Sequence, residues 1–472
     1  MKRLASRIKQ RLHLIRQRLH VVNAWSCIFC CGICDAVKYY ALEQKCKRQW
    51  HQTSTSPKGE KKGLRIAFVI PWYGENIGGG AEAETRGLIH ALRLQHPNLQ
   101  IEVLTTTLRE FAADWNMPVH KPGTQDEDGI LVHRFHPSRP KRSIFHFLNG
   151  SYLMPNAGPC PSSPQSSPIP RFAEAYFLRR MIRSSKLLEY IQMHRDRYDA
   201  FIMIPYMFSL TVEACIVAGP KGMLIPCLHH ERYAYLHVYK TAFSQIGAAL
   251  CHMRREAALF ASLFPAAPAP TVIGEQVDVD VKKGNPERFL KKYDITSPFI
   301  LYAGRQIEGK NLPLMVAYFK HFRATNPQWS NLQFVLIGKG DLDYNDTPGI
   351  RSLGFIPAED KIDAYRAALA LVMLSTNESF SIVMMEAWLQ ETPSIVSADC
   401  DVTSEHIRES GGGYAVATPE AFEMALTELL SDQDKCADLG VRGRNYVLNN
   451  FTPEIVTTRF CDALYRVVET AR

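Results

Sequence analysis

Two cations and two carboxylates in the second half of the chain have types and spacings that suit chemistry on a phosphorylated ligand. Arg305 and Lys310 lie five residues apart in a Gly-bearing loop, where together they could neutralise a diphosphate. A departing diphosphate gains negative charge, so the same cations would stabilise it as a leaving group. Glu378 and Glu386 lie eight residues apart, the first in a polar turn and the second inside an apolar helical pattern. The simpler interpretation is two solvated loop cations, one surface Glu and one salt-bridged Glu.

The elements that would position these residues are the strands and one helix of an α/β domain. Residues 298–305 and 371–374 are apolar runs typical of strands buried on both faces. The turn 375–378 leads into a mostly apolar helix predicted over residues 380–389. Such a helix start presents free backbone N–H groups and the positive end of the helix dipole to an anion. Because burying a lone carboxylate is unfavourable, Glu386 is expected to have a partner.

The first half of the globular sequence opens with a similar unit. Residues 64–71 are predicted to form a strand, and a Gly-rich loop leads from it into a helix over residues 81–94. Gly79 and Gly80 permit close approach of the backbone to a phosphate or a sugar. The run matches neither the dinucleotide fingerprint nor the Walker loop, so alone it predicts only a phosphate-tolerant turn.

A cluster of polar residues ends the strand predicted over residues 222–230. His229 and His230 are followed by Glu231 and Arg232, at the strand end where parallel sheets gather ligands. A zinc site would need three or four converging ligands, and no H-E-x-x-H helix is present. Two interpretations remain open: one histidine contacts substrate, or a hydrogen-bonded core histidine lies beside an exposed one.

Between these elements the sequence also predicts less regular regions. The Pro/Ser-rich segment 149–170 is expected to be an irregular, mobile surface loop. A helix is expected over residues 171–193, and the chain ends in a helix over residues 454–470 that begins at Thr452-Pro453.

Length and composition are those of a soluble globular protein with two domains. The chain has 472 residues, of which 46% are hydrophobic and 22% are charged. The net charge of +8, much of it near the N-terminus, favours an anionic surface or a phosphorylated ligand over nucleic acid. Seven of the twelve cysteines are scattered over residues 160–461 without the spacing of a disulfide framework, which indicates thiols in a reducing cytosol.

The first 60 residues differ from all that follows. Leu4, Ile8, Leu12, Ile15, Leu19 and Val22 recur at three- and four-residue steps, as on one face of a helix, and basic residues occupy the other faces. Such a helix suits an anionic membrane surface. The apolar stretch 21–37 is too short to span a bilayer, and no signal-peptide cleavage site follows it. We therefore expect a cytoplasmic protein, peripheral on a membrane, with a linker at residues 51–62.

A C-x-x-C-C-x-x-C run lies within that stretch. Its cysteines are Cys27, Cys30, Cys31 and Cys34. Paired C-x-x-C spacing can bind zinc or an iron–sulfur cluster. The same positions also form one helical face, so an apolar membrane-facing stripe or lipid-modified thiols are favoured over metal.

The second half resembles the retaining glycosyltransferases of the GT-B fold, specifically glycosyltransferase family four, or glycosyl transferases group 1. The motifs that carry the resemblance occur in order: Gly304-Arg305 with Lys310, Gly338-Lys339-Gly340, Gly354-Phe355, and Glu378 with Glu386 as an E-x7-E pair. In the first half, Gly79-Gly80 and the segment LHHERYAY fit the same family. The resemblance covers residues 64–472 and is strongest over residues 299–413.

This resemblance implies an α/β, GT-B architecture of two Rossmann-like domains facing a cleft, beside the helical basic N-terminal extension. The expected parts are an extension and linker at 1–60, an acceptor-side domain at 61–285, a donor-nucleotide domain at 286–455 and a C-terminal helix at 456–472.

The resemblance also implies the reaction and its residues. A sugar would pass from a nucleotide-sugar donor, with retention, to a glycan or lipid-linked acceptor, without a cofactor or a metal. The catalytic residues would be Glu378, Arg305, Lys310 and His229. The donor-binding residues would be Gly79, Gly80, Gly304, Gly338, Phe355, Phe380, Ser381, Ile382, Val383 and Glu386.

Three positions depart from the family pattern. Glu391 stands where a Gly usually precedes the Pro of a turn, His230 stands where an Asp commonly follows the His, and Glu405 is the acid of an altered strand-end turn. These departures bear on the sugar pocket, and Glu391 is expected to contribute to specificity. A phosphorylase or epimerase on the same scaffold is an alternative, as is a non-catalytic nucleotide- or carbohydrate-binding homologue that acts as an assembly partner.

Overall fold

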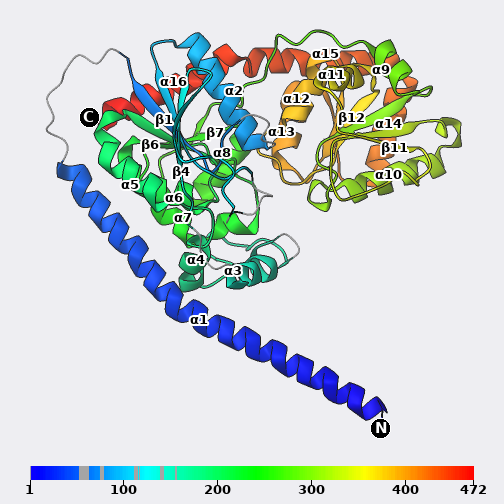
Figure 1. Ribbon diagram of the computed structural model, residues 1–472. Coiled ribbons are helices and arrows are strands. Elements are labelled where there is room, and N and C mark those ends of the chain that lie inside the picture. The colour runs from blue at the N-terminus through cyan, green and yellow to red at the C-terminus, as the bar shows by residue number, and fades with distance from the viewer. Residues whose placement is uncertain are drawn as a thin grey trace. The chain divides into compact units, whose positions relative to one another are not determined.

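The computed structural model describes residues 2–52, 63–74, 79–110, 115, 117–138, 143–154 and 157–471, and within the first helix it describes side chains from residue 24 to residue 50. The chain forms two compact domains, each built on its own sheet (Figure 1). The first comprises Met1–Leu250, Leu259–Thr271 and Asp462–Arg472, and the second comprises Cys251–Ala258 and Val272–Cys461.

These divisions differ from the boundaries expected from the sequence. A short segment that begins at Cys251 belongs to the second domain although the chain returns afterwards to the first. The last helix, α16 (Pro453–Thr470), contributes its beginning to the second domain and its end to the first. Composition indicates linkers but does not show which sheet a helix packs on. The assignment of these two segments to the other domain was therefore not predicted.

The first domain holds an eight-stranded sheet in the order β3-β4-β2-β1-β5-β6-β7-β8. Edge strand β3 runs antiparallel to β4, and the strands from β4 through β7 pair in parallel. The strands are β1 (Arg65–Val69), β2 (Gln100–Thr106), β3 (Gly123–Glu127), β4 (Ile130–Phe135), β5 (Ala200–Met203), β6 (Gly222–Leu224), β7 (Ala248–Cys251) and β8 (Thr271–Val272). The strands predicted over residues 64–71 and 222–230 are present as β1 and β6, although β6 ends at Leu224, six residues earlier than expected. Helices on both faces of the sheet explain the apolar runs (Figure 1).

The helices of this domain differ in part from those predicted. They are α2 (Gly80–Gln95), α3 (Ser143–Leu148), α4 (Arg171–Leu178), α5 (Ser185–His194), α6 (Ser209–Ala218), α7 (His237–Phe243) and the second half of α8 (Arg254–Leu263), whose first half belongs to the second domain. The single helix expected over residues 171–193 is therefore wrong. It breaks after Leu178, and α5 begins anew with Ser184, whose side chain accepts a hydrogen bond from the backbone N–H of Leu187 at 3.3 Å.

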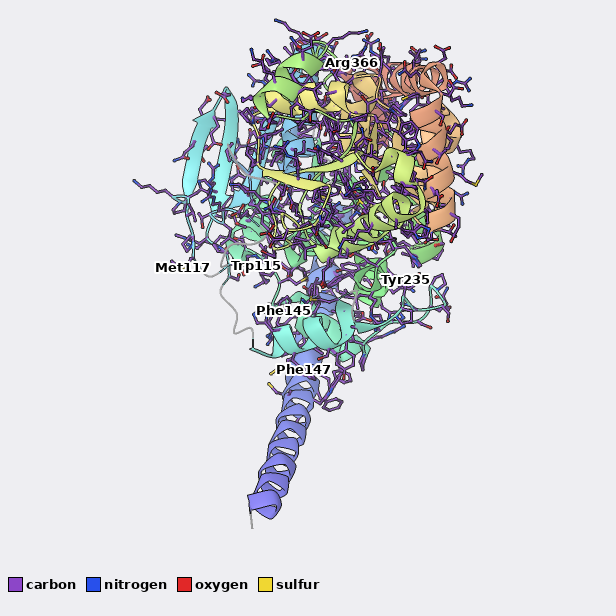
Figure 2. The ribbon with its side chains drawn as sticks, turned by 90° about the vertical axis from the view of Figure 1, so that its right-hand side faces the viewer. Trp115, Met117, Phe145, Phe147, Tyr235 and Arg366 are labelled. Atoms are coloured by element: carbon purple, nitrogen blue, oxygen red, sulfur yellow. The ribbon has the colours of Figure 1, made fainter. Side chains whose placement is uncertain are left out.

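Aromatic side chains join α3 and α4 to the body of the first domain. The ring of Phe145 stacks on that of Phe177 with centroids 4.8 Å apart, and Trp115 contacts both Phe145 and Phe208 edge-on. Figure 2 shows Trp115 and Phe145 close together on this side of the domain. Such ring contacts make α3 part of a packed core rather than a loose insertion.

The Pro/Ser-rich segment between α3 and α4 is mostly irregular, as predicted, but it is anchored. The loop after β6 holds it. Arg232 Nε donates to the carbonyl of Tyr152 at 2.6 Å, and the Tyr233 hydroxyl donates to Asn149 Oδ1 at 2.7 Å. Lys240 Nζ donates to the carbonyl of Pro164 at 2.6 Å. These bonds anchor the described part of the segment to the first domain.

The N-terminal helix α1 (Lys2–Gln52) is longer than expected, and its second half is packed on the first domain. Ile28 and Cys46 are fully buried, and the Tyr39 hydroxyl lies 3.1 Å from Ser209 Oγ on α6. The linker expected at residues 51–62 lies for the most part outside the described residues. Across the described part of the chain, no helix combines the length and the apolar content needed to cross a membrane.

The second domain holds a six-stranded parallel sheet in the order β11-β10-β9-β12-β13-β14. Its strands are β9 (Phe299–Ala303), β10 (Gln333–Ile337), β11 (Ile350–Gly354), β12 (Ala370–Met373), β13 (Ser394–Ser397) and β14 (Gly413–Val416). Its helices are α9 (Pro286–Lys292), α10 (Leu312–Thr325), α11 (Ala358–Ala367), α12 (Ile382–Leu389), α13 (Asp401–Ser410), α14 (Pro419–Ser431), α15 (Gln433–Asn450) and the beginning of α16.

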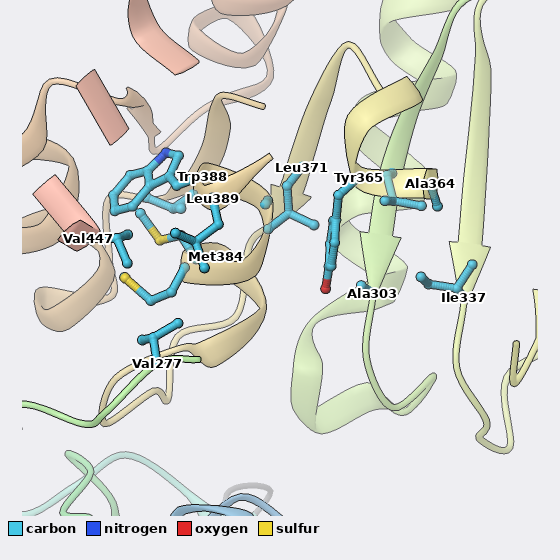
Figure 3. Close-up of a cluster of buried hydrophobic side chains, with 14 of the residues drawn as sticks. Val277, Ala303, Ile337, Ala364, Tyr365, Leu371, Met384, Trp388, Leu389 and Val447 are labelled. Atoms are coloured by element: carbon cyan, nitrogen blue, oxygen red, sulfur yellow. The ribbon is translucent and has the colours of Figure 1, made fainter. Parts of the chain in front are cut away.

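Two hydrophobic clusters cover the two faces of this sheet. Along β9, Leu301 points into one cluster while Ile300 and Tyr302 point into the other, as the period of two in a strand requires. The first cluster centres on Trp388 of α12, whose indole N–H donates to the carbonyl of Gly412 at 2.8 Å (Figure 3). Helix α15, which the sequence did not predict, packs on Trp388 through Gly443, where a Cβ would lie 2.2 Å from the indole.

Candidate active site

Three loops meet at the carboxyl edge of the second sheet. Strands β10, β9 and β12 are neighbours and run parallel, so the loops that follow them lie at the same edge. The loop after β9 carries Gly304, Arg305 and Lys310. Asn311 ties it to the end of β12, because its side-chain amide donates to the carbonyl of Leu374 at 2.9 Å. Asn311 adopts a left-handed conformation with φ 57°, which Asn tolerates better than most residues.

Lys310 and Glu378 form an ion pair across these loops. Lys310 Nζ lies 2.7 Å from Glu378 Oε1, and the side chains are 26% and 11% exposed. From the sequence each residue was expected to act separately on a ligand, whereas the structure pairs them with one another. An ammonium group has three donors, so Lys310 keeps two for a phosphate while it holds Glu378.

Arg305 is positioned through its backbone, and its side chain is exposed. The hydroxyl of Tyr302 donates to the Arg305 carbonyl at 2.6 Å. Burial and the nearby Glu378 carboxylate raise the pKa of Tyr302 above its usual value, so the hydroxyl stays a donor. The guanidinium therefore projects from a fixed point at the sheet edge.

The loops after β9 and β10 approach so closely that two positions require glycine. A Cβ on Gly338 would lie 1.9 Å from the carbonyl oxygen of Gly304, and its φ is 122°. A Cβ on Gly340 would lie 2.0 Å from the carbonyl oxygen of Gln306. Buried Gln306 fastens the pair, since its amide donates to the Gly338 carbonyl at 3.0 Å. This contact explains the Gly-Lys-Gly motif as backbone packing.

Phe355 follows β11 at the same edge and is 76% exposed. Lys339 Nζ lies 5.6 Å from the centre of its ring, within the range of a cation–π contact. A large aromatic ring that no apolar neighbour covers is available to stack on a planar ligand.

The start of α12 faces the ion pair without a side-chain cap. Ser381 precedes the helix in a left-handed conformation, with φ 84° and no capping hydrogen bond from its hydroxyl to the first turn. The first-turn residues Ile382 and Val383 are half-buried against the core. The predicted helix start is therefore present, although the helix begins two residues later than expected, and its binding of an anion stays a prediction.

Phe380 and His406 hold this helix start from behind. The Phe380 ring is buried in the core, so only its backbone can take the predicted donor-binding part. His406 Nε2 lies 3.1 Å from the Phe380 carbonyl oxygen, which can only accept, so Nε2 donates. The other ring nitrogen, Nδ1, lies 3.1 Å from the Tyr446 hydroxyl, which donates to Glu409 Oε2 at 3.2 Å. Burial favours the neutral form of His406, which positions the turn before α12.

The free energy of unfolding should depend on pH through His406. Burial lowers the pKa of His406 to about 3, against 6.5 for the free side chain. Below pH 6.5 the unfolded chain binds a proton that the folded one does not, so stability falls as pH falls, by roughly 1 kcal/mol per pH unit. We expect His406→Gln, which keeps a donor but does not titrate, to flatten this slope between pH 6.5 and 4.5 in chemical denaturation. The control is His321→Gln, at a position 42% exposed. Equal slopes in wild type and His406→Gln would contradict the assignment.

Glu386 has its partners inside the protein. Lys361 Nζ donates to Oε1 at 2.7 Å and the Tyr365 hydroxyl donates to Oε2 at 2.8 Å, both from α11. The partner expected from the sequence is therefore present without a ligand. Glu386 is also 29% exposed, so its carboxylate keeps free lone pairs for a hydroxyl group.

The expectation that Glu391 contributes to sugar specificity is not supported. Glu391 follows the C-terminal end of α12, about 12 Å along the helix from the anion-facing start. Its carboxylate pairs with Lys283 at 3.0 Å and Arg366 at 2.8 Å, and these bonds lower its pKa even though burial alone would raise it. Its φ of 59° is the left-handed conformation that a glycine adopts without strain, which explains the glycine of the family pattern.

Glu405 also has a structural contact. One carboxylate oxygen accepts from the backbone N–H of Arg255, in the first turn of α8, at 2.9 Å. Its side chain is 98% covered, which raises its pKa above the usual range. The acid at this altered turn therefore holds a helix start rather than facing the loops after β9 and β12.

Three predicted residues lie in the first domain. Gly79 precedes α2, and a Cβ there would lie 1.9 Å from the Glu82 carboxylate, whereas a Cβ on Gly80 would meet no atom within 4 Å. The atoms near Gly79 belong to the end of the Glu82 side chain and not to backbone, so packing does not require glycine at either position. His229 Nδ1 lies 3.6 Å from Glu231 Oε1, and the Tyr206 hydroxyl donates to that same oxygen at 2.9 Å. At 3.6 Å the carboxylate lies near the ring nitrogen but beyond hydrogen-bond distance, so a catalytic role for His229 stays a prediction.

His230, the neighbour of His229, is turned to a different partner. Its Nε2 lies 2.8 Å from the Tyr235 hydroxyl, within the same loop. The two histidines of the LHHERYAY segment therefore have separate surroundings, and only His229 faces a carboxylate.

Solved structures of low identity share this architecture. A sucrose-phosphate synthase from Thermosynechococcus elongatus has a TM-score of 0.61 at 17% identity, covering 87% of this chain and 100% of its own. An α,α-trehalose-phosphate synthase (UDP-forming) from Burkholderia vietnamiensis has a TM-score of 0.65 at 12% identity, covering 88% and 99%. Anabaena HepE in complex with UDP and glucose has a TM-score of 0.58 at 14% identity, covering 85% and 99%. These likenesses confirm the GT-B fold.

One family model matches most of the second domain. Residues 286–446 match the model of the family described as Glycosyl transferases group 1, which is the family that the motifs resemble. Curated relatives are the D-inositol 3-phosphate glycosyltransferases of Corynebacterium urealyticum, 35% identical over 88 residues, and of Nocardia farcinica, 34% identical over 88 residues. Each match covers 18% of this chain and about a fifth of the relative, 20% and 19% respectively.

Sequence reasoning missed three positioning residues: Gln306, Asn311 and His406. Each acts through a backbone carbonyl on another loop, so no local pattern marks it. Asn311 left the clearest signal, because an Asn directly before a helix suggests an unusual backbone conformation.

Proposed function

We propose that this protein is a glycosyltransferase that moves a sugar from a nucleotide-sugar donor, with retention, to a glycan or lipid-linked acceptor. In the transfer, the bond between the anomeric carbon and the diphosphate oxygen breaks, and a bond from that carbon to the acceptor hydroxyl oxygen forms. The acceptor hydroxyl proton passes to the departing nucleoside diphosphate, which leaves with the electron pair of the broken bond. Each atom is accounted for without a redox partner.

The observation that carries the proposal is the ion pair of Lys310 with Glu378 beside Arg305 and the uncapped start of α12. Two cations and a helix start match the charge of a diphosphate, and a carboxylate lies against one of the cations. A diphosphate would use the two remaining donors of Lys310, and Glu378, held beside that cation, would lie toward the donor sugar. Because these groups supply the positive charge, we expect the reaction to need no divalent metal.

The remaining roles follow from position. Glu386, held by Lys361 and Tyr365, would accept from the ribose hydroxyls, and exposed Phe355 would lie against the nucleotide. In the first domain, His229 with Glu231 would face the sugar and the acceptor, and Gly79-Gly80 would leave room for the donor. HepE and an E. coli enzyme were crystallised with UDP-containing ligands, so UDP-sugars are the first donors to test.

The experiment is a thermal-shift screen of nucleotide sugars, followed by an assay of nucleoside diphosphate release. We expect one donor to raise the melting temperature, since a ligand that binds only the folded state stabilises it. Glu378→Gln should lower turnover of that donor by about 100-fold or more while the protein still melts cooperatively. Glu287→Gln, at an exposed position on α9, is the control and should leave turnover unchanged.

The outcomes separate the alternatives. A donor that binds but is never turned over with any glycan or lipid-linked acceptor would favour the non-catalytic binding homologue. Equal turnover in Glu378→Gln and wild type would refute the assigned carboxylate.

A further inference from the structure

Helix α1 has two different apolar faces in its second half, and only one of them is covered. The covered face has residues at three- and four-residue steps that are buried against the first domain: Ile28, Gly32, Asp35, Tyr39, Glu43 and Cys46. Asp35 pairs with Arg180 at 2.6 Å and with Arg179 at 3.3 Å, both at the end of α4. A Cβ on Gly32 would lie 2.2 Å from the Phe172 carbonyl oxygen, so helix and domain touch backbone to backbone.

The opposite face is apolar and exposed. Ile33 is 44% exposed, Val37 is 61% exposed and Tyr40 is 64% exposed, and Cys30 and Cys34 are exposed beside them. At about 100° per residue, Ile33 lies roughly 200° around the helix from buried Asp35. A continuous apolar stripe on the outside of a helix that is already packed on its inside calls for a second, different contact.

Aromatic rings extend the exposed stripe onto the domain. Phe29 is 53% exposed and lies edge-on to Phe172, with ring centroids 5.2 Å apart. Trp25 contacts Phe147 and Tyr152 edge-on at 6.5 and 5.7 Å. Figure 2 shows Phe147 beside α1. Half-exposed Trp, Tyr and Phe side chains are typical of the boundary between a bilayer and water.

The sequence of the preceding turns continues the same stripe. Three- and four-residue steps lead back from Ile33 through Cys30, Ser26 and Val22 to the apolar positions Leu19, Ile15, Leu12, Ile8 and Leu4. Because α1 is a single helix from Lys2 to Gln52, these positions share one register with the exposed stripe. The apolar positions of residues 4–22 and the apolar stretch 21–37, which were described separately from the sequence, thus contribute to one face of α1.

The charge of this segment indicates what the face contacts. Residues 1–34 contain seven Lys and Arg and no Asp or Glu, and the first acid, Asp35, is already paired inside the protein. Two such segments side by side would repel one another, whereas anionic headgroups would attract both.

We propose that α1 lies in the plane of an anionic bilayer surface, with the stripe of Ile33, Val37 and Tyr40 toward the acyl chains and the first domain fixed on its other side. The cysteine run then belongs to this stripe, since thiols behave as small apolar groups. Within the described residues, the four thiols form no group whose sulfur atoms could share one ion, so the metal alternative is not supported. This inference does not depend on the proposed chemistry, because it concerns attachment alone.

The test is flotation of the purified full-length protein with vesicles, either phosphatidylcholine alone or phosphatidylcholine with 30% phosphatidylglycerol (about a third anionic lipid, in the range that attracts basic segments). We expect binding to the anionic vesicles that weakens with salt, and a loss of about tenfold or more in Ile33→Asp/Val37→Asp. The matched control is Met193→Asp, at a position on α5 that is 74% exposed, which should float as wild type does.

Three results would overturn the proposal. The first is equal flotation of Ile33→Asp/Val37→Asp and wild type when both melt at the same temperature. The second is equal binding to neutral and anionic vesicles. The third is a stable dimer in light scattering that the double substitution dissolves while no vesicle binding is seen, because a second copy would then cover the stripe. If the double variant melts lower, Tyr40→Ser, at a more exposed position, replaces it in the same assay.

Discussion

Replacing Lys310 with Met is expected to lower the kcat/KM for nucleoside diphosphate release by about 100- to 1000-fold. The ammonium group lies 2.7 Å from Glu378 at the edge where Arg305 and α12 also present positive charge. A cation in that place stabilises a diphosphate most when it departs, so the loss should fall on turnover more than on donor affinity. Met keeps the length and the apolar stem of the side chain, so the change is mainly one of charge.

The control for this substitution is Lys320→Met. Lys320 lies exposed on α10, the helix that follows the same loop, so it matches Lys310 in type and element without facing the sheet edge. We expect turnover within about twofold of wild type there. The role of Lys310 would be contradicted if Lys310→Met, folded by thermal melting, retained more than a third of wild-type turnover.

Replacing Gly338 with Ala is expected to destabilise the second domain by about 3 kcal/mol and to abolish donor binding. The new Cβ would lie 1.9 Å from the Gly304 carbonyl oxygen, at a φ of 122° that side chains rarely adopt. The two loops would have to separate, which moves Arg305 away from the sheet edge. Chemical denaturation measures the first effect, and the thermal shift with the donor measures the second.

Gly309→Ala is the matched control in the same site. A Cβ there would meet only Ile307 Cδ1 at 3.8 Å, an ordinary contact, and the residue has no positive φ. Stability should change by less than about 0.5 kcal/mol, and donor binding should persist. Similar losses in Gly309→Ala and Gly338→Ala would show that any side chain in these loops is harmful, rather than the close approach of two backbones.

Much of the fold could be predicted because strand signals are local. Strands β9 and β10 are apolar runs whose alternate residues enter two different cores, as Ile300 and Leu301 do, and such runs are visible in one sequence. Helix breaks were less visible. The end of α4 at Leu178 carries neither Pro nor Gly, so the pattern was extended wrongly into α5.

The site was predictable in its location but not in its internal contacts. Glycines and charged residues at strand ends indicate the carboxyl edge of a parallel sheet, where Arg305, Lys310 and Glu378 were placed correctly. The partners of Glu386 and Glu391 come from α11 and from a loop before α9, more than twenty residues away in sequence. No local sequence pattern identifies such partners. Glu386 was therefore predicted to bind the donor, and Glu391 was predicted to contribute to sugar specificity.

By itself, the sequence determined that this chain is an α/β protein with a charged site at a strand edge and a basic amphipathic helix at its start. Only the tertiary structure decided that Lys310 holds Glu378, 68 residues along the chain, and which face of α1 is covered. Lys310 meets Glu378 because β9 and β12 are neighbours in the sheet. The sequence does not reveal this adjacency, since β10 and β11 lie between the two strands along the chain. The covered face of α1 was not predictable, because two apolar faces of one helix look alike until a domain covers one of them.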